Sequence, residues 1–191
     1  MKEKARCSWP SNDPLMKEYH DKEWGVPSKD DQHQFEHHIL EVFQAGLSWR
    51  TILHRRDGFR KAFAGFDPKK VSKFDEKDIK RLLADVGIIR NNLKVRSAIN
   101  NASRFLEIIK EHGSFYNFLL QFKPRNRKIF TDLNQLPAET PESAALSKEL
   151  KNLGFKFVGP TTCYAHMQSV GIVNDHIKSC FRHKEIMNMQ K

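Results

Sequence analysis

Two cysteines and two histidines near opposite ends of the chain could together hold a metal ion. Cys7 and His20 lie near the start, and His176 and Cys180 lie near the end. Two cysteines with two histidines are a ligand set that zinc prefers. Four protein ligands leave no open position for water, so such a site would be structural and would fasten the two ends of the chain together.

The spacing of these residues also allows a simpler interpretation. His176 and Cys180 are four residues apart, which on a helix capped by Asn174 or Asp175 would project both from one face. The first pair is thirteen residues apart, too far for a local metal-binding loop. Spacing alone therefore favours ordinary buried thiols and surface histidines, and metal analysis is needed to decide.

A second candidate site lies between Lys148 and Gly171, where the pattern predicts a helix, a glycine-containing hairpin and another helix. Glycines such as Gly159 let the backbone approach a phosphate closely. Free N–H groups at the start of the second helix, around Thr161, would point at that anion, and Lys156 would add a charge. A plain corner between two helices explains the same pattern.

The chain is basic, with 33 Lys and Arg against 23 Asp and Glu and a formal net charge of +10. This excess favours a polyanionic partner, and nucleic acid is a better candidate than a membrane surface. No apolar stretch has membrane-spanning length, and Met1 to Arg6 lack the apolar run of a signal peptide. Three cysteines, an odd number, favour metal binding or burial over disulfides. These features predict a cytoplasmic protein.

Helical periodicity recurs from end to end and alternating strand patterns are absent, which predicts an all-α fold. Prolines and capping residues set the expected helix boundaries. The segment from Lys123 to Thr140, rich in prolines and basic residues, is expected to be a surface connection. The expected helices run over Leu15 to Trp24, Asp31 to Ala45, Trp49 to Leu53, Lys69 to Phe74, Asp75 to Val86, Asn91 or Asn92 to Ile109, Phe115 to Phe122, Glu142 to Leu153 and Pro160 to Val170.

The segment after the hairpin resembles part of a known repair superfamily. Val173-Asn174-Asp175-His176-Ile177 is similar to the Val-Asp-Thr-His-Val segment that follows a helix-hairpin-helix in endonuclease-III-like DNA glycosylases. The stretch from Asp85 to Asn91, followed by Lys94, resembles a second loop of that superfamily. Asn174 stands at the position of the catalytic aspartate, and an amide cannot act as a carboxylate. The resemblance implies either an inactive protein or an unusually labile substrate, and it leaves open whether Asp175, or a water held by Asn174, assists.

Longer motifs are spread over the chain, namely Cys7-Ser8-Trp9, Asp13-Pro14-Leu15, Tyr19 to Pro27, Glu41, Gln44 to Trp49, Gly87 to Arg90 and Ala144 to His176. Together they closely resemble the type I 3-methyladenine DNA glycosylases. The similarity covers nearly the whole chain and fails mainly from Gln121 to Glu139 and after Cys180. It implies a single glycosylase unit over residues 1–191, with two helical lobes, a base pocket between them and a helix-hairpin-helix at about residues 148–171. It also implies a monomer that acts on double-stranded DNA containing alkylated bases, and a structural zinc on Cys7, His20, His176 and Cys180.

The base-binding residues of that family fall on Tyr19, Glu41 and Trp49, with Trp9 nearby, and Glu41 takes the catalytic role. Methylation at N3 makes the purine cationic, so the glycosidic bond is already activated and the pocket must mainly recognise a cation. Trp49 offers a face for stacking and cation–π attraction, and Glu41 can accept hydrogen bonds from the adenine edge. Helical periodicity places Glu41 off the apolar stripe of its helix, where a solvated acid fits equally well.

The loop Ala45-Gly46-Leu47 corresponds to the family loop that meets the gap in DNA once a base has left the stack, with Leu47 as the wedge. We expect Lys156, Arg90 and Lys94 to follow the phosphates. No lysine follows the start of the second hairpin helix as a Schiff-base nucleophile would, so hydrolysis without a lyase step is expected.

Other residues have less specific expected roles. Trp24 is expected to pack in the core, and Met16 stands where a family tyrosine lines the pocket. His33, His37 and His38 are expected on the surface. Two alternative functions remain: a non-catalytic zinc-stapled DNA-binding module, and a zinc hydrolase such as a nucleobase deaminase. The pocket residues argue against the first, and the missing His-x-Glu and Pro-Cys-x-x-Cys motifs argue against the second.

Overall fold

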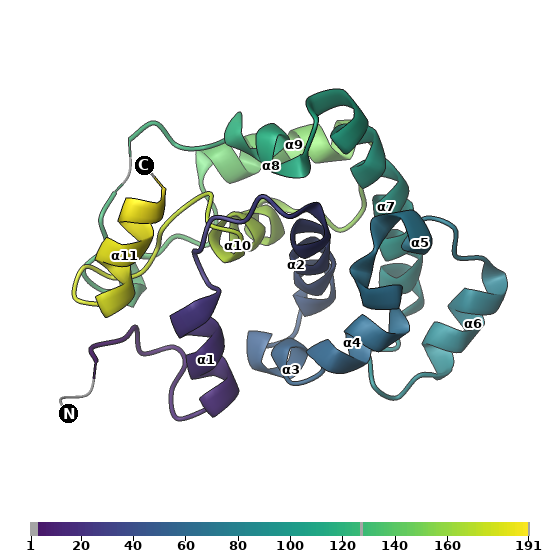
Figure 1. Ribbon diagram of the computed structural model, residues 1–191, viewed down its shortest axis with the longest axis horizontal. Helices are drawn as coiled ribbons and strands as arrows, with labels where there is room; N and C mark the ends of the chain where they lie inside the picture. Colours follow the sequence, from purple (N-terminus) through teal and green to yellow (C-terminus); the bar gives the residue numbers. More distant parts are fainter. Residues whose placement is uncertain (1–3, 127, 191) are drawn as a thin grey trace.

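The computed structural model describes residues 4–126 and 128–190, and these residues form helices and no strand. The all-α prediction is therefore confirmed, while Met1 to Glu3 lie outside the described residues. None of the described helices is long and apolar enough to cross a membrane. The helices are α1 (Pro14–Lys22), α2 (Asp31–Gln44), α3 (Trp49–Leu53), α4 (Arg56–Ala62), α5 (Pro68–Val71), α6 (Glu76–Ala84), α7 (Asn92–His112), α8 (Phe115–Leu120), α9 (Pro141–Asn152), α10 (Pro160–Ser169) and α11 (Phe181–Met189), with short 3-10 turns at Ala64–Phe66 and Leu133–Gln135 (Figure 1).

Local capping chemistry sets most helix starts. The Asp13 side chain accepts hydrogen bonds from the first free N–H groups of α1, and Ser48 caps α3 in the same way. Asp75 and Asp78 form a reciprocal capping box at the start of α6. Each of these caps involves residues at most three positions apart, so the starts could be predicted from the sequence.

The larger lobe is built around α2, which runs through the middle of the molecule and packs against α7 and α10 (Figure 1). Phe35, Ile39 and Phe43 repeat every four residues along α2 and are fully buried, as the apolar stripe predicts. Burying each of these side chains contributes about 2 kcal/mol. The stripe thus fixes which face of α2 meets the core and which face is left for other contacts.

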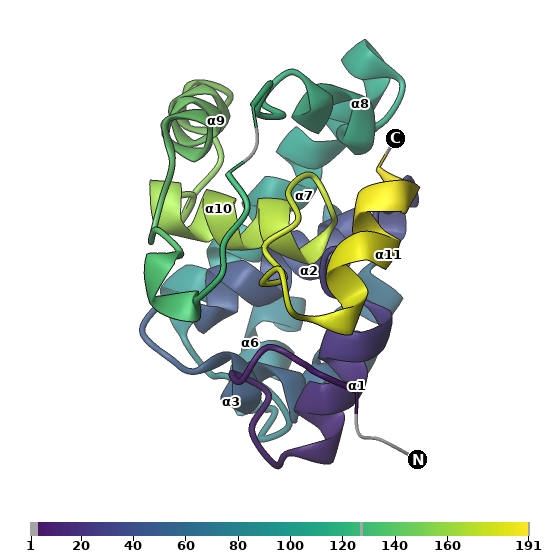
Figure 2. The ribbon, with the colours of Figure 1, turned by 90° about the vertical axis from the view of Figure 1, so that its left-hand side faces the viewer.

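A smaller lobe joins the two ends of the chain. Its buried cluster comprises Cys7, Met16, Tyr19, Trp24, Leu53 and Cys180. The N–H of Phe181 donates to the carbonyl of Ala5 at 2.9 Å, and α11 lies beside the N-terminal segment and α1 (Figure 2). Trp49 packs against both clusters, so α3 lies where the two lobes meet.

Two helices, α4 and α11, are additional to those predicted, and one predicted helix does not form. His176 and Cys180 lie in an irregular segment before α11 rather than on a helix. The Asn174 side chain accepts a hydrogen bond from the N–H of His176, a local turn that competes with helix formation. Gly171, at φ +76, packs so closely that a Cβ would lie 2.4 Å from the backbone nitrogen of Pro27. The chain therefore turns toward α1 at this point.

Two other boundaries differ from the prediction. The helix α6 ends at Ala84, and Val86 lies beyond it with 74% of its surface exposed. The helix α5 ends at Val71, three residues before the predicted end. The segment between α8 and α9 is largely irregular, which agrees with the predicted surface connection.

Candidate functional site

The four predicted metal ligands come together in the smaller lobe. The ligand atoms of Cys7, His20, His176 and Cys180 all lie within 4.8 Å of one another, and the four side chains are buried. Sγ of Cys180 is 3.5 Å from Nε2 of His20 and 3.5 Å from Nδ1 of His176. Sulfur and nitrogen ligands of a tetrahedral zinc are about 3.5 Å apart, given metal distances of about 2.3 and 2.0 Å. The separations therefore fit zinc.

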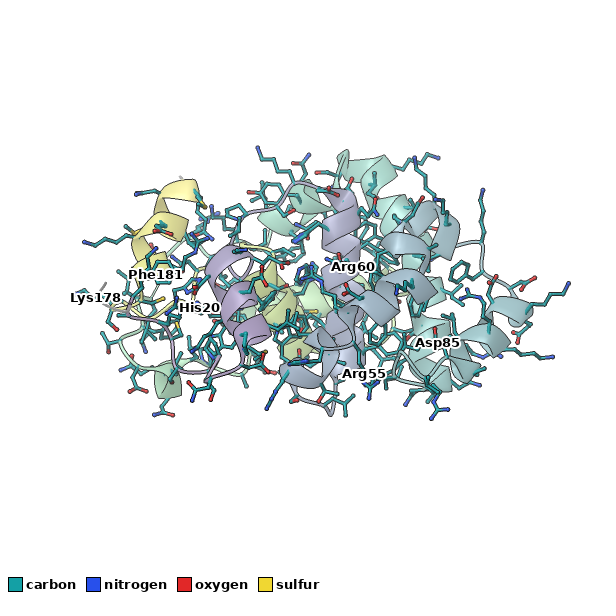
Figure 3. All side chains as sticks on the ribbon, turned by 60° about the horizontal axis from the view of Figure 1, so that its bottom comes forward. His20, Arg55, Arg60, Asp85, Lys178 and Phe181 are labelled. Atoms are coloured by element: carbon teal, nitrogen blue, oxygen red, sulfur yellow. The ribbon has the colours of Figure 1, made fainter. Side chains whose placement is uncertain are left out.

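Hydrogen bonds orient both histidine rings toward the thiols. Nδ1 of His20 donates to Asp21 at 2.8 Å, and Nε2 of His176 donates to the carbonyl of Trp24 at 3.0 Å. Each ring thus turns its unprotonated nitrogen toward the sulfur atoms, as metal-binding histidines do. Arg6 in turn holds Asp21 through hydrogen bonds of 2.8 to 3.0 Å. Figure 3 shows His20 on the side of the molecule that carries Lys178 and Phe181.

A cavity of about 210 Å³ lies where the two lobes meet. The predicted base-binding residues Trp9, Tyr19, Glu41 and Trp49 all line it. Met16 does not line it and is buried in the smaller cluster instead. The lining residues that the prediction missed are Trp24, Gln44, Leu136, Ala165 and Gln168. Of these, Ala165 and Gln168 are three positions apart on α10, a helical spacing that could have indicated a shared face.

Among the described residues, Glu41 is the only one whose carboxyl group lines this cavity. Its side chain is 5% exposed, and burial raises its pKa to about 8. Among the described residues it makes no hydrogen bond or ion pair. Burial, followed by the nearby Glu41 charge, raises the pKa of Tyr19 well above its usual value, so the phenol keeps its proton. The alternative of a solvated acid at Glu41 is therefore wrong.

Aromatic rings form the walls around this carboxyl group. The rings of Tyr19 and Trp49 lie 5.1 Å apart at 46°, and those of Trp9 and Trp24 lie 5.2 Å apart, edge to face. The indole N–H groups of Trp9 and Trp49 are buried and have no hydrogen-bond partner within the described part of the chain. Unpaired donors and an unpaired acceptor in one aromatic cavity are typical of a site completed by a ligand.

A buried charge network supports this wall from behind. His37 is fully buried, and its ring stacks on Tyr19 at 6.0 Å. Arg56 contacts Glu36 at 2.7 Å and Glu23 at 2.8 Å. Burial opposes ionisation of Glu23, but the hydrogen bond with His37 and the charge of Arg56 lower its pKa to about 2. Arg60 also binds Glu36, at 2.7 Å, and its side chain is partly exposed.

The prediction that His33, His37 and His38 lie on the surface is wrong for the last two, which are 0% and 2% exposed. Their partners come from distant segments, since Asn101 donates to His38. His33 is half-buried, and a ring nitrogen of His33, a ring nitrogen of His37 and a carboxylate oxygen of Glu23 all lie within 4.8 Å of one another. These three side chains could hold a metal ion, but the guanidinium of Arg56 already places a positive charge beside Glu23 and His37.

The cavity opens toward the loop after α2. A neighbouring hollow of about 180 Å³ shares Glu41, Gln44 and Ala165 with it and extends along Gly46, Leu47 and Thr161. Leu47 is 41% exposed at the tip of the loop. Gly46 has φ +80, a conformation that favours glycine.

Lys94 supports this loop rather than facing solvent. Its side chain is buried, and Nζ donates to the carbonyls of Phe43 at 2.9 Å and Ala45 at 2.6 Å. The prediction that Lys94 follows phosphates is therefore wrong, because its ammonium group satisfies the open end of α2. Its charge is used to hold the loop that carries Leu47.

The hairpin between α9 and α10 presents a second exposed edge. Gly159 has open space where a Cβ would lie, and the first N–H groups of α10 have no side-chain cap. Lys156 is exposed, while Asn101 grips its backbone N–H and carbonyl at 2.9 and 3.0 Å. Arg90 is also exposed, in the loop whose Gly87 packs closely on Gly58. A bare helix start beside basic side chains is suited to a phosphate.

Asn174 and Asp175 both have partners within the protein. The Asn174 side chain donates to the carbonyl of His183 at 3.0 Å. Oδ2 of Asp175 accepts hydrogen bonds from Tyr164 at 2.5 Å and Gln168 at 2.7 Å. Asn174 therefore binds the backbone of α11 and of the segment before it, and Asp175 binds side chains of α10.

Comparison with known proteins agrees with this geometry. A family model described as methyladenine glycosylase matches residues 9–183. DNA-3-methyladenine glycosylase 1 of Escherichia coli strain K12 is 46% identical over 177 residues, which are 92% of this chain and 95% of that protein. A crystal structure of 3-methyladenine DNA glycosylase I superimposes with a TM-score of 0.89 at 45% identity, covering 94% of this chain and all of the other. The Staphylococcus aureus enzyme gives a TM-score of 0.88 at 33% identity, covering 93% and 96%. The chain therefore belongs to the methyladenine glycosylase family.

Proposed function

We propose that this protein is a DNA glycosylase of base excision repair that hydrolyses the N-glycosidic bond of 3-methyladenine in alkylated duplex DNA. The observation that carries the proposal is the buried, unpartnered carboxyl group of Glu41 inside an aromatic cavity. The relatives support it, since they are named as 3-methyladenine glycosylases and the Staphylococcus aureus structure concerns recognition of that base.

The cavity chemistry suits a cationic leaving group. The N3-methylated purine carries positive charge in the nucleoside, and the free base is neutral, so the bond breaks without an added proton. The rings of Trp49 and Tyr19 stack on the base, and the Glu41 carboxylate binds its edge and stabilises the charge. Trp9 lines the same cavity, and its ring lies 6.2 Å from that of Tyr19, edge to face. An acid at position 174 is not needed for this chemistry, because the substrate is already activated.

Binding requires the nucleotide to leave the stack, which costs a few kcal/mol. Leu47 fills the gap in the duplex, and Gly46 gives the loop its tight turn. Lys156, Gly159 and Thr161 bind a phosphate at the start of α10, and Arg90 binds another. We propose that the protein acts as a monomer, because all four proposed base-binding residues, Trp9, Tyr19, Glu41 and Trp49, come from the same chain.

We further propose that the Cys/His cluster holds a structural zinc ion. Cys7, His20, His176 and Cys180 supply the ligands, and a bound zinc would tie the N-terminal segment to the segment before α11. Tyr19 precedes a ligand directly, and the carbonyl of Trp24 accepts a hydrogen bond from another. With all four positions filled by these side chains, a bound zinc would support one wall of the cavity and would have no position open to the substrate.

Release of free base from methylated duplex DNA, followed by chromatography, tests the proposed activity. We expect 3-methyladenine to appear with an abasic site in the DNA and no strand cleavage. DNA binding without released base would indicate a non-catalytic module, and a deaminated base would indicate a hydrolase of the deaminase type. Trapping of the protein on DNA by borohydride would contradict hydrolysis without a lyase step. Less than about half an equivalent of zinc in the purified protein would contradict the metal proposal.

A further inference from the structure

The wall of the cavity formed by α10 carries a polar side chain that the mechanism above does not use. Gln168 lines the cavity together with Glu41, and it lies one helical turn after Ala165, which lines it too. Its side chain is half-buried. A base bound to Glu41 would therefore have the Gln168 amide among its neighbours.

Asp175 holds this amide in one orientation. Nε2 of Gln168 donates to Oδ2 of Asp175 at 2.7 Å, and the hydroxyl of Tyr164 donates to the same oxygen at 2.5 Å. Asp175 is 5% exposed, and a carboxylate only accepts hydrogen bonds, so the amide must turn its NH₂ group toward it. Among the described residues no group donates to Oε1 of Gln168, which is left as an acceptor.

We propose that Gln168 is a specificity-determining residue that accepts a hydrogen bond from the 6-amino group of the methylated base, and that Asp175 is its positioning residue. The inference rests on the proposed function and names how the base is distinguished. A 6-amino group has two hydrogens, which two acceptors, Glu41 and Gln168, can share. A 6-keto purine places an oxygen there, and two acceptors would face each other without a hydrogen. The cavity thus selects methylated adenine over methylated 6-keto purines.

Binding of two free bases that differ in the group at position 6 tests this inference. Quenching of tryptophan fluorescence reports binding directly, because Trp9, Trp24 and Trp49 line the cavity. We expect the wild-type protein to bind 3-methyladenine at least about tenfold more tightly than 3-methylhypoxanthine. Gln168→Leu should reduce this preference to less than about threefold, mainly by weakening 3-methyladenine. Gln168→Met serves if the leucine variant does not fold, and Gln121→Leu, an exposed glutamine outside the cavity, should keep the full preference.

The role of Asp175 is tested in both backgrounds. Asp175→Asn would allow the Gln168 amide to flip. It should therefore lower the preference for 3-methyladenine over 3-methylhypoxanthine in the wild-type protein and leave that preference unchanged in the Gln168→Leu protein. A merely structural role would change both backgrounds equally, and that result would overturn the positioning role. Equal binding of the two bases by the wild type, or a preference that survives Gln168→Leu, would overturn the specificity role. Base preference without base release from DNA would instead contradict the proposed function.

Discussion

The Cys/His cluster and the base cavity are both buried and polar, and they differ in how their polar atoms are satisfied. In the cluster each histidine has one nitrogen bonded to a protein acceptor and the other turned toward the thiols. In the cavity, Glu41 and the indole N–H groups of Trp9 and Trp49 have no partner within the described residues. A closed set of polar groups is suited to holding the fold together, and an open set is suited to a ligand.

The largest expected effect concerns the Cys/His cluster. Cys7→Ser should remove bound zinc and lower the free energy of unfolding by on the order of 5 kcal/mol, because structural zinc sites contribute on the order of 10 kcal/mol. Zinc content and denaturant unfolding measure the two effects. Cys163→Ser is the matched control, since Cys163 is an equally buried thiol in the larger core, away from the cluster. Equal losses in the two variants would contradict a metal site.

In the cavity, replacing Glu41 should raise stability, whereas replacing a ligand of the Cys/His cluster should lower it. Burial raises the pKa of Glu41 from 4.5 to about 8, so the folded protein holds this proton more tightly than the unfolded chain. Below pH 4.5 the carboxyl group is protonated in both the folded and the unfolded protein, so its ionisation does not affect stability. As the pH rises from 4.5 to 8 the group ionises in the unfolded chain but stays protonated in the folded protein, and this difference lowers the free energy of unfolding increasingly. Glu41→Gln should stabilise the protein at pH 8, by at most about 5 kcal/mol. A loss of stability in this variant, measured by denaturant unfolding at pH 8, would indicate that Glu41 is structural.

The same pKa predicts how activity depends on pH. The carboxylate that binds a cationic base forms as the pH rises toward 8, so kcat/KM for base release should increase about 50-fold between pH 6 and pH 8 and then level off. The profile of Glu41→Gln should be flat over the same range. A wild-type profile that is flat from pH 6 to 8 would show that Glu41 does not titrate in the free enzyme.

Lys156 and Lys94 should differ in a smaller way. Lys156→Met removes an exposed charge, so DNA affinity should fall several-fold and the dependence on salt should decrease by about one unit of slope. Lys94→Met removes a buried charge that holds two carbonyls, so base release should slow while the salt slope stays unchanged. Titrations of duplex DNA at several salt concentrations measure both. A reduced salt slope in the Lys94 variant would indicate that Lys94 contacts DNA phosphates, contrary to the role inferred from its burial.

Features that depend on contacts between near neighbours in the sequence could be predicted, and features that depend on contacts between distant segments could not. Helix starts at Asp13 and Ser48 depend on near neighbours and were predicted. The burial of His37 and Glu41 depends on elements that the fold brings from elsewhere. His37 was expected on the surface, and helical periodicity fitted a solvated Glu41 equally well. The spacing of His176 and Cys180 suited a helix equally well, and a side-chain turn at Asn174 decided the outcome.

For the site, family resemblance supplied residues that patterns could not. Tyr19, Glu41 and Trp49 come from separate helices and meet in one cavity. Gln168 was not predicted, although it lies in the segment from Ala144 to His176 that resembles the family. Its proposed role depends on its hydrogen bond to Asp175, which only the folded structure reveals. Lys94 was assigned to phosphates on its charge alone, and its burial reverses that role.

The most direct test of the account is the single-turnover rate of 3-methyladenine release from methylated duplex DNA at pH 8, compared between the wild type and Glu41→Gln. We expect the variant to be slower by at least about 100-fold, since it loses the carboxylate that, among the described residues, is the one negative group lining the cavity. Glu107→Gln, which changes an exposed acid on α7, should match the wild type. Equal rates for the wild type and Glu41→Gln would contradict the claim that the unpartnered carboxyl group of the cavity acts on the base.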